Sequence, residues 1–160
     1  MIASRRVRLP PVTVRVFQSQ DFETLYRLDQ ACYPPGIAYS RQALREFLAA
    51  PGAQTWVAEE EGKLVAFIIV EKVRRADGHI ITLDVREDCR RRGLGSALLA
   101  TAEAWLADHR VRRISLETAV DNSAGVAFWM RAGYSATARW SRYYLDRLDA
   151  YRMEKELSEP

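Results

Sequence analysis

The sequence of 160 residues is poor in cysteine, with only Cys32 and Cys89. Their separation fits neither a metal site nor a disulfide framework, so we expect two reduced thiols and no bound metal. No segment approaches the roughly 18 uninterrupted apolar residues of a membrane span. The first residues also lack the apolar stretch of a secretory signal. The sequence therefore predicts a cytoplasmic protein with no membrane partner.

Internal repeats, low-complexity tracts and linkers are missing as well, which predicts one folded domain over residues 12–160 after a basic N-terminal extension at residues 1–11. The formal net charge of +3 and the pI of 9.0 favour an anionic ligand. The arginines at 90–92 are interleaved with the acidic Asp84, Glu87 and Asp88. We therefore expect no nucleic-acid partner.

Two kinds of apolar periodicity divide the chain into strands and helices. Strands are expected at 12–17, 55–59, 64–70, 79–85, 113–120, 134–144 and 150–157, and helices at 19–32, 40–48, 93–109 and 123–132. Three strands in succession predict an antiparallel meander, and the strand–helix–strand order that follows predicts a parallel crossover. This order indicates an α/β (α+β) fold.

One stretch between a predicted strand and a predicted helix, Arg90-Arg91-Arg92-Gly93-Leu94-Gly95-Ser96, combines arginines with glycines. The first turn of a helix has unpaired N–H groups and a partial positive charge, which together bind phosphate. Glycine leaves room for a diphosphate to reach those amides. On this pattern alone, a phosphate-binding turn and a solvated basic loop are both open.

A second block, from Leu116 to Tyr134, adds an Asn followed by an aromatic residue and a Gly-aromatic pair. With both blocks in this order, the sequence resembles the GNAT superfamily of acetyl-coenzyme A-dependent N-acetyltransferases. Within it, the resemblance is to RimI-type protein N-terminal acetyltransferases. That narrower similarity rests on Leu116-Glu117 before Asn122, on the pair Tyr143-Tyr144, and on the closing segment 149–154.

The resemblance implies the GNAT fold, a single mixed, mostly antiparallel central sheet of about six to seven strands flanked by about four helices. It also implies acetyl-coenzyme A (acetyl-CoA) as cofactor, with the pantetheine along the strand at 83–85 and the Val85 backbone facing the thioester carbonyl. Asn122, a helix cap by its position, would contact the pantetheine. The implied cofactor-binding residues are Leu83, Val85, Arg90, Arg91, Arg92, Gly93, Leu94, Gly95, Ser96, Asn122 and Trp129.

Glu117 is the principal catalytic candidate. Strand alternation directs Ile114 and Leu116 to one face and Glu117 to the other, in the middle of its strand. There it would act as general base, directly or through water, or bind the amine. The alternative is a strand carboxylate paired with an arginine.

Trp129 stands where RimI-type relatives carry a tyrosine, the presumed acid for the leaving thiolate. An indole N–H donates a hydrogen bond but does not titrate. Protonation would then come from water, from another tyrosine such as Tyr134 or Tyr143, or from no dedicated acid.

Four tyrosines, Tyr33, Tyr39, Tyr143 and Tyr144, would either form an acceptor slot or cover the sheet edge. The function expected is transfer of acetyl to a primary amine, either the N-terminal α-amine of a protein or a small-molecule amine. A coenzyme A-binding regulator without catalysis is the alternative from another class. The protein is expected to be a monomer or a homodimer.

Overall fold

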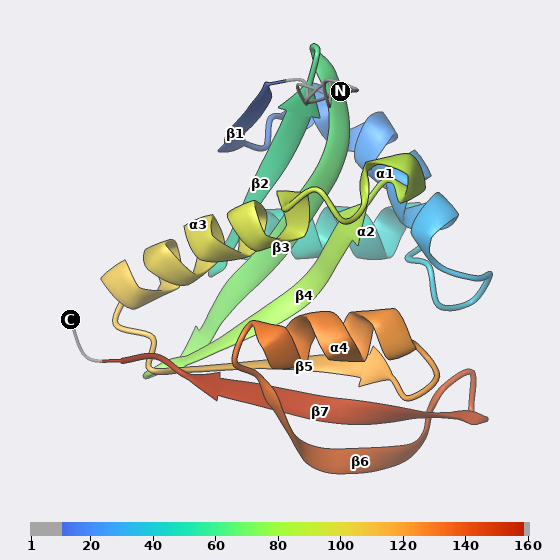
Figure 1. Ribbon diagram of the computed structural model, residues 1–160, viewed down its shortest axis with the longest axis vertical. Helices are drawn as coiled ribbons and strands as arrows, with labels where there is room; N and C mark the ends of the chain where they lie inside the picture. Colours follow the sequence, from blue (N-terminus) through green and yellow to red (C-terminus); the bar gives the residue numbers. More distant parts are fainter. Residues whose placement is uncertain (1–10, 159–160) are drawn as a thin grey trace, which may run out of the picture.

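The computed structural model describes residues 11–158, and residues 1–10 of the expected basic extension lie outside that range. Within the described range, seven strands form one sheet in the order β1-β2-β3-β4-β5-β7-β6 (Figure 1). The strands are β1 (Val12–Val16), β2 (Ala53–Glu60), β3 (Lys63–Arg74), β4 (Asp77–Val85), β5 (Arg113–Ala119), β6 (Ser135–Tyr144) and β7 (Leu148–Glu156). The α-helices are α1 (Phe22–Cys32), α2 (Arg41–Ala49), α3 (Leu94–Asp108) and α4 (Ser123–Arg131), and two short 3-10 helices are η1 (Ser19–Asp21) and η2 (Glu87–Cys89).

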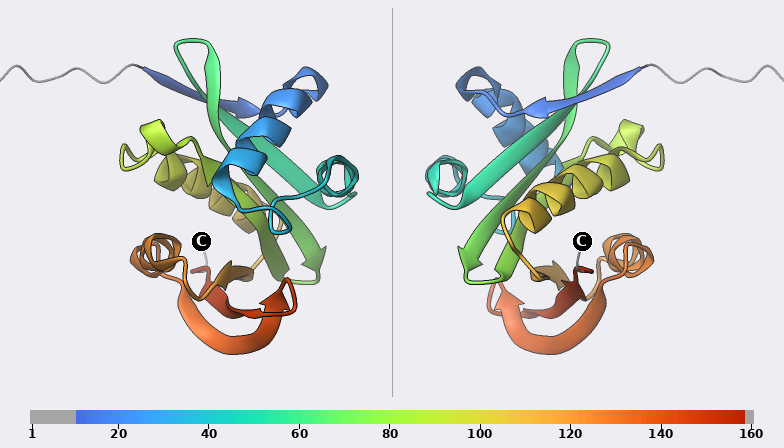
Figure 2. Two further views of the ribbon diagram at one scale, coloured as in Figure 1. Left: turned by 90° about the vertical axis from the view of Figure 1, so that its right-hand side faces the viewer. Right: turned by 90° about the vertical axis from the view of Figure 1, so that its left-hand side faces the viewer.

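The pairing confirms a mixed, mostly antiparallel sheet. Strands β1 to β4 pair antiparallel in sequence order, and β5, β7 and β6 form a second antiparallel group. The predicted parallel crossover joins the two groups between β4 and β5. Figure 2 shows the far end of this second group, where β6 bows outward from the body of the molecule.

Apolar side chains form one core on each face of the sheet. On one face, α1 and α2 bury Leu25, Leu28 and Leu44 against Val57, Phe67, Ile69 and Ile81. On the other face, α3 and α4 cover a larger cluster that includes Leu98, Ala102, Leu106, Trp129, Ile68, Ile114, Leu116 and Met153. The continuous apolar run 65–70 of β3 is at most 1% exposed because helices cover both of its faces. Each fully buried large side chain there contributes roughly 1.5–3 kcal/mol of transfer free energy.

Most predicted helix boundaries agree with the structure. The hydroxyl of Ser40 accepts the Ala43 N–H at 3.1 Å, and Asn122 Oδ1 accepts the Gly125 N–H at 3.1 Å. The start of α1 differs, because residues 19–21 form a 3-10 turn. The carboxylate of Asp21, and not the hydroxyl of Ser19, accepts the Gln18 N–H at 2.8 Å.

The β3–β4 hairpin is longer than the pattern predicts. The expected strands, 64–70 and 79–85, omit the polar rim 71–74 and residues 77–78, where backbone pairing continues without apolar alternation. Among residues 11–158, no helix is both long enough and apolar enough to cross a membrane.

Candidate active site

Strands β4 and β5 pair over only three residues and then diverge. Residues Asp77 to His79 pair with Arg113 to Ser115, and beyond them each strand continues alone along a widening gap (Figure 1). A one-residue bulge in β4 contributes to the divergence, since Ile69 pairs with Thr82 and Val70 with Ile80, which leaves Ile81 extra. A bulge bends the strand that carries it. The gap between β4 and β5 is therefore a product of the sheet itself.

The edge of β4 that faces this gap carries backbone groups that β5 does not pair. The carbonyl oxygens of Ile81, Leu83 and Val85 accept hydrogen bonds from Tyr39 Oη at 3.2 Å, Tyr33 Oη at 3.5 Å and Arg90 Nε at 2.9 Å, respectively. The N–H of a strand residue points to the same edge as its carbonyl. The amides of Leu83 and Val85 thus face the gap, where an extended ligand would pair with them.

The N-terminus of α3 lies next to this edge and has no side-chain cap. Gly93 occupies the N-cap position with φ of 82°, in the left-handed region that glycine adopts without strain. A Cβ at Gly93 would meet no atom within 4 Å, so there is open space above the first turn. A Cβ at Gly95 would lie 3.4 Å from the Phe128 ring and 3.7 Å from Leu83. The uncapped amides, the open space and the lack of acidic residues in the first turn fit a diphosphate.

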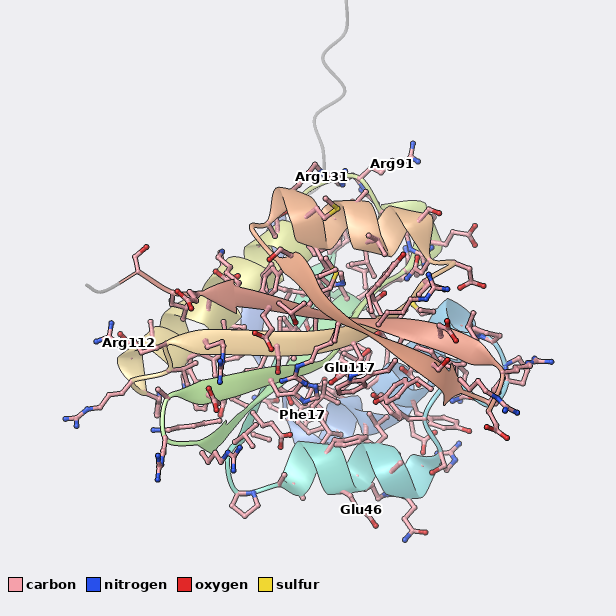
Figure 3. All side chains as sticks on the ribbon, turned by 90° about the horizontal axis from the view of Figure 1, so that it is seen from below. Phe17, Glu46, Arg91, Arg112, Glu117 and Arg131 are labelled. Atoms are coloured by element: carbon pink, nitrogen blue, oxygen red, sulfur yellow. The ribbon has the colours of Figure 1, made fainter. Side chains whose placement is uncertain are left out.

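The three arginines before this helix have different environments. Arg90 turns back to the Val85 carbonyl, and Arg92 binds Glu60 at 3.0 Å. Arg91 is exposed and extends away from the molecule (Figure 3), and it has no ion-pair partner within residues 11–158. Of these three arginines, only Arg91 is therefore available to an anion without breaking a bond within residues 11–158.

The two cofactor candidates on α4 also differ. Asn122 is exposed and caps the helix. Trp129 is 8% exposed and lies edge-to-face against Phe128 and Tyr134, at centroid distances of 5.0 Å and 5.3 Å. Its indole N–H has no hydrogen-bond partner in the described part of the chain. Trp129 is thus mainly a core residue with one unused donor.

Glu117 projects from the opposite face of β5. Its neighbours Ile114 and Leu116 enter the core under α3 and α4, as the alternation predicts. Oε2 of Glu117 lies 2.6 Å from Nε2 of His79, and Oε1 lies 3.3 Å from a guanidinium nitrogen of Arg152. The Glu117 side chain is 12% exposed and lies near the middle of the sheet (Figure 3). Glu117 therefore has both an imidazole and an arginine partner.

His79 is the site residue that the sequence analysis missed. It is the last β4 residue paired with β5, so its imidazole lies where the gap begins. Its Nδ1 lies 3.6 Å from Glu71, on the side away from Glu117. Residue spacing gives no sign of this arrangement, because the parallel register between β4 and β5 is set in three dimensions.

Two tyrosines of the expected acceptor slot interact with Glu117, and the other two bond to β4. Burial, with the charge of Glu117 as a second cause, raises the pKa of Tyr143 above its ordinary value. Burial also raises the pKa of Tyr144, with added contributions from Tyr143 and Glu117. Tyr33 and Tyr39 approach from the loop between α1 and α2 and reach β4. Tyr143 is 48% exposed and can meet a ligand from solvent.

Tyr134, in contrast, lies away from the gap. It is 2% exposed, and its hydroxyl donates to Glu103 of α3 at 3.0 Å. Lys155 holds the same carboxylate at 2.9 Å. Burial and the charge of Glu103 raise the pKa of Tyr134 far above its usual range. The structure thus supports a packing role for Tyr134, and we leave it out of the proposed catalytic set.

A mixed sheet that opens between two parallel strands, beside an uncapped helix that follows a glycine-containing turn, is the GNAT fold. The model of the Acetyltransferase (GNAT) family matches residues 22–134, and the chain belongs to this family of acetyl-CoA-using enzymes. An uncharacterized N-acetyltransferase of Methanocaldococcus jannaschii is 30% identical over 89% of this chain and 90% of its own length. An N-alpha-acetyltransferase of Sulfurisphaera tokodaii is 26% identical, over 90% of this chain and 92% of its own.

The structural comparison agrees with this assignment. The ribosomal-protein-S18-alanine N-acetyltransferase of Escherichia coli superposes with a TM-score of 0.82 at 24% identity, over 94% of this chain and 96% of that one. This match confirms the fold expected from the RimI-type resemblance. The protein is accordingly an N-acetyltransferase that transfers an acetyl group to an amine.

Proposed function

We propose that this enzyme acetylates the N-terminal α-amine of a protein or peptide, with acetyl-CoA as donor and the His79–Glu117 pair as proton acceptor. The observation that carries the proposal is the 2.6 Å contact between these two side chains at the point where β4 and β5 separate. This contact places two side chains that can accept a proton at one end of the gap between β4 and β5. The N-terminus of α3, which suits a diphosphate, lies on the other side of that gap.

The cofactor-binding part of the proposal rests on backbone groups. The first-turn amides of α3, with Arg91 beside them, would hold the diphosphate, and the β4 edge at Leu83 and Val85 would pair with the pantetheine. Bound acetyl-CoA supplies an acetyl thioester, an activated acyl group. The Val85 N–H, which points into the gap, would stabilise negative charge on the thioester carbonyl.

The proton of the acceptor ammonium would pass to Glu117, directly or through water. A neutral amine is required for attack, and a carboxylate within hydrogen-bond reach of imidazole can accept and pass on this proton. His79 would hold Glu117 in place and relay the proton toward Glu71 and solvent. Arg152 is shared between Glu117 and Glu154, which lies 3.0 Å from it.

We assign no titrating side chain to the leaving thiolate. The Tyr134 hydroxyl already donates its hydrogen bond to Glu103. Burial raises the pKa of Tyr33, whose hydroxyl lies at the Leu83 carbonyl, well above its usual value, so this hydroxyl can form a hydrogen bond but is a poor acid. A thiol titrates near pH 8.5, so water can protonate the thiolate without a strong acid.

A peptide acceptor is favoured by the surface beside Glu117. Trp140 and Tyr143 are 37% and 48% exposed on β6, with ring centroids 5.5 Å apart. Exposed aromatic side chains next to a catalytic carboxylate suit a chain with side chains of its own more than a compact, highly charged amine. The relative named N-alpha-acetyltransferase supports the same acceptor class.

The test is an acceptor panel with acetyl-CoA. It contains peptides with a free N-terminus, the same peptides with a blocked N-terminus and an internal lysine, and polyamines. Thiol release measures turnover, and fragmentation mass spectrometry locates the acetyl group. We expect acetylation of the α-amine only. Turnover confined to polyamines would overturn the acceptor assignment, and coenzyme A binding by calorimetry without turnover on any amine would favour a regulator.

A further inference from the structure

Two carboxyl groups lie buried on the face of the sheet covered by α1. Asp29 of α1 is 0% exposed and Asp84 of β4 is 1% exposed. The two carboxyls interact directly with each other. Each also has one oxygen, Asp29 Oδ1 and Asp84 Oδ2, that is fully buried and has no hydrogen-bond partner outside the pair within residues 11–158. The mechanism above uses neither side chain.

The remaining oxygens connect this pair to the tyrosine loop, residues 33–40. Asp29 Oδ2 accepts the backbone N–H of Tyr39 at 2.7 Å. Asp84 Oδ1 accepts the hydroxyl of Thr82 at 2.6 Å, and that hydroxyl lies 3.3 Å from Tyr33 Oη. The pair is thus bonded, directly or through one hydroxyl, to both ends of the loop.

Two adjacent carboxylates cannot both stay charged in a site that excludes water, because each charge is desolvated and repels the other. One proton between the two orphan oxygens removes the repulsion and one of the two buried charges, and the remaining charge is stabilised by a charge-assisted hydrogen bond. Within residues 11–158, the ionisable groups around Asp84 are Asp29, Cys32, Tyr33 and Tyr39. Arg90 bonds to the Val85 carbonyl and to the Cys32 sulfur, at 3.7 Å, and to neither carboxyl of the pair. On β3, the residue opposite Asp84 is the apolar Phe67.

We propose that Asp29 and Asp84 share one proton, and that this bond fastens the tyrosine loop to β4 and so sets the affinity for the acceptor amine. The acceptor part rests on the proposed function. Asp29 and Asp84 are positioning residues, since they reach the site only through Tyr33, Tyr39 and Thr82. Burial raises the pKa of both carboxyls, and the charge of Asp29 raises that of Asp84 further.

Loss of the shared proton at alkaline pH would place two like charges in contact and loosen the loop. We therefore expect the KM for the acceptor to rise about tenfold more, between pH 6 and pH 9.5, in the wild-type enzyme than in Asp84→Asn, with kcat much less affected. Asparagine keeps a donor for Asp29 but has no proton to lose. Glu23→Gln, which removes an exposed carboxylate of the same helix α1, is the matched control and should behave as wild type.

The experiment measures kcat and KM for a peptide acceptor across this pH range in the three proteins. Identical profiles in wild type and Asp84→Asn would overturn the proposal. If Asp84→Asn does not fold, Asp29→Asn replaces it. A second arm needs no acceptor: amide hydrogen exchange of residues 33–40 in the wild-type chain, corrected for intrinsic rates, should accelerate with pH relative to α2. Unchanged protection of residues 33–40 across this range would overturn the shared-proton bond. This outcome can be observed even if the enzyme acetylates no amine, so it distinguishes a failure of the shared-proton proposal from a failure of the proposed function.

Discussion

Nε2 of His79 and Oε2 of Glu117 lie 2.6 Å apart across two strands that pair over only three residues. The contact closes the narrow end of the gap between β4 and β5. It places the proposed proton acceptor on the face opposite α3, and the proposal gives each side of the sheet a separate task. The side of α3 suits the cofactor, and the side of Glu117 suits the amine.

Replacement of the carboxylate tests the proposed base. We expect Glu117→Gln to lower kcat about a hundredfold or more, with the larger loss at low pH, where the amine is protonated and a base is most needed. Coenzyme A affinity, measured by calorimetry, should not change. Glu154→Gln is the matched control, because it removes the other carboxylate of Arg152 without touching His79. A flat pH profile with full turnover would rule out a base at this position.

His79→Asn should lower kcat about tenfold to a hundredfold, since Glu117 would lose the imidazole that orients it and relays its proton. Glu71→Gln affects only the more distant contact of 3.6 Å with His79 Nδ1 and should lower kcat severalfold at most. Steady-state kinetics of both variants give the comparison. Equal effects of the two substitutions would contradict the order of importance that the distances indicate.

Gly93→Val should weaken coenzyme A binding at least tenfold, because a side chain would fill the open space above the first turn of α3. Valine also strains a backbone with φ of 82°, by roughly 1–2 kcal/mol. Gly62→Val carries the same strain at φ of 75° in the β2–β3 turn and also has open space around it. Comparison of the coenzyme A affinities of the two variants separates the effect of backbone strain from that of the filled space. Equal affinities would argue against a diphosphate at α3.

Tyr134→Phe should reduce the free energy of unfolding by about 1 kcal/mol, through loss of the hydrogen bond to Glu103, and leave kcat within about twofold. Chemical denaturation and steady-state kinetics measure the two quantities. A large drop in kcat with intact stability would return Tyr134 to the catalytic set.

The buried carboxyls should also govern stability against pH. Their pKa values are raised by folding, so the folded state binds more protons than the unfolded state, and stability falls as pH rises from about 4 toward the folded pKa values. Asp84→Asn removes much of this slope, and its melting temperature relative to wild type should increase with pH. A difference in melting temperature between Asp84→Asn and wild type that stays constant from pH 4 to pH 9 would contradict the raised pKa values of the two carboxyls.

The order of strands and helices, the parallel crossover and the glycine-rich turn could all be predicted from the residues. Each depends on local rules: alternation along β5, the capping side chains of Ser40 and Asn122, and the freedom of Gly93 at positive φ. The polar rim of the β3–β4 hairpin escaped prediction because its backbone pairing continues without apolar alternation. The 3-10 turn before α1 was missed because Asp21, bonded to Arg15, replaces Ser19 at that boundary.

Which residues meet was decided by the tertiary structure. The sequence by itself determined that Glu117 leaves the core face of its strand, and it indicated an anion-binding turn before α3. It did not determine the parallel register that brings His79 to Glu117, the packing that buries Tyr134 against Glu103, or the approach of α1 that brings Asp29 to Asp84. Local preferences act over a few residues along the chain, whereas these contacts depend on how a bulged strand, a helix and a crossover pack together.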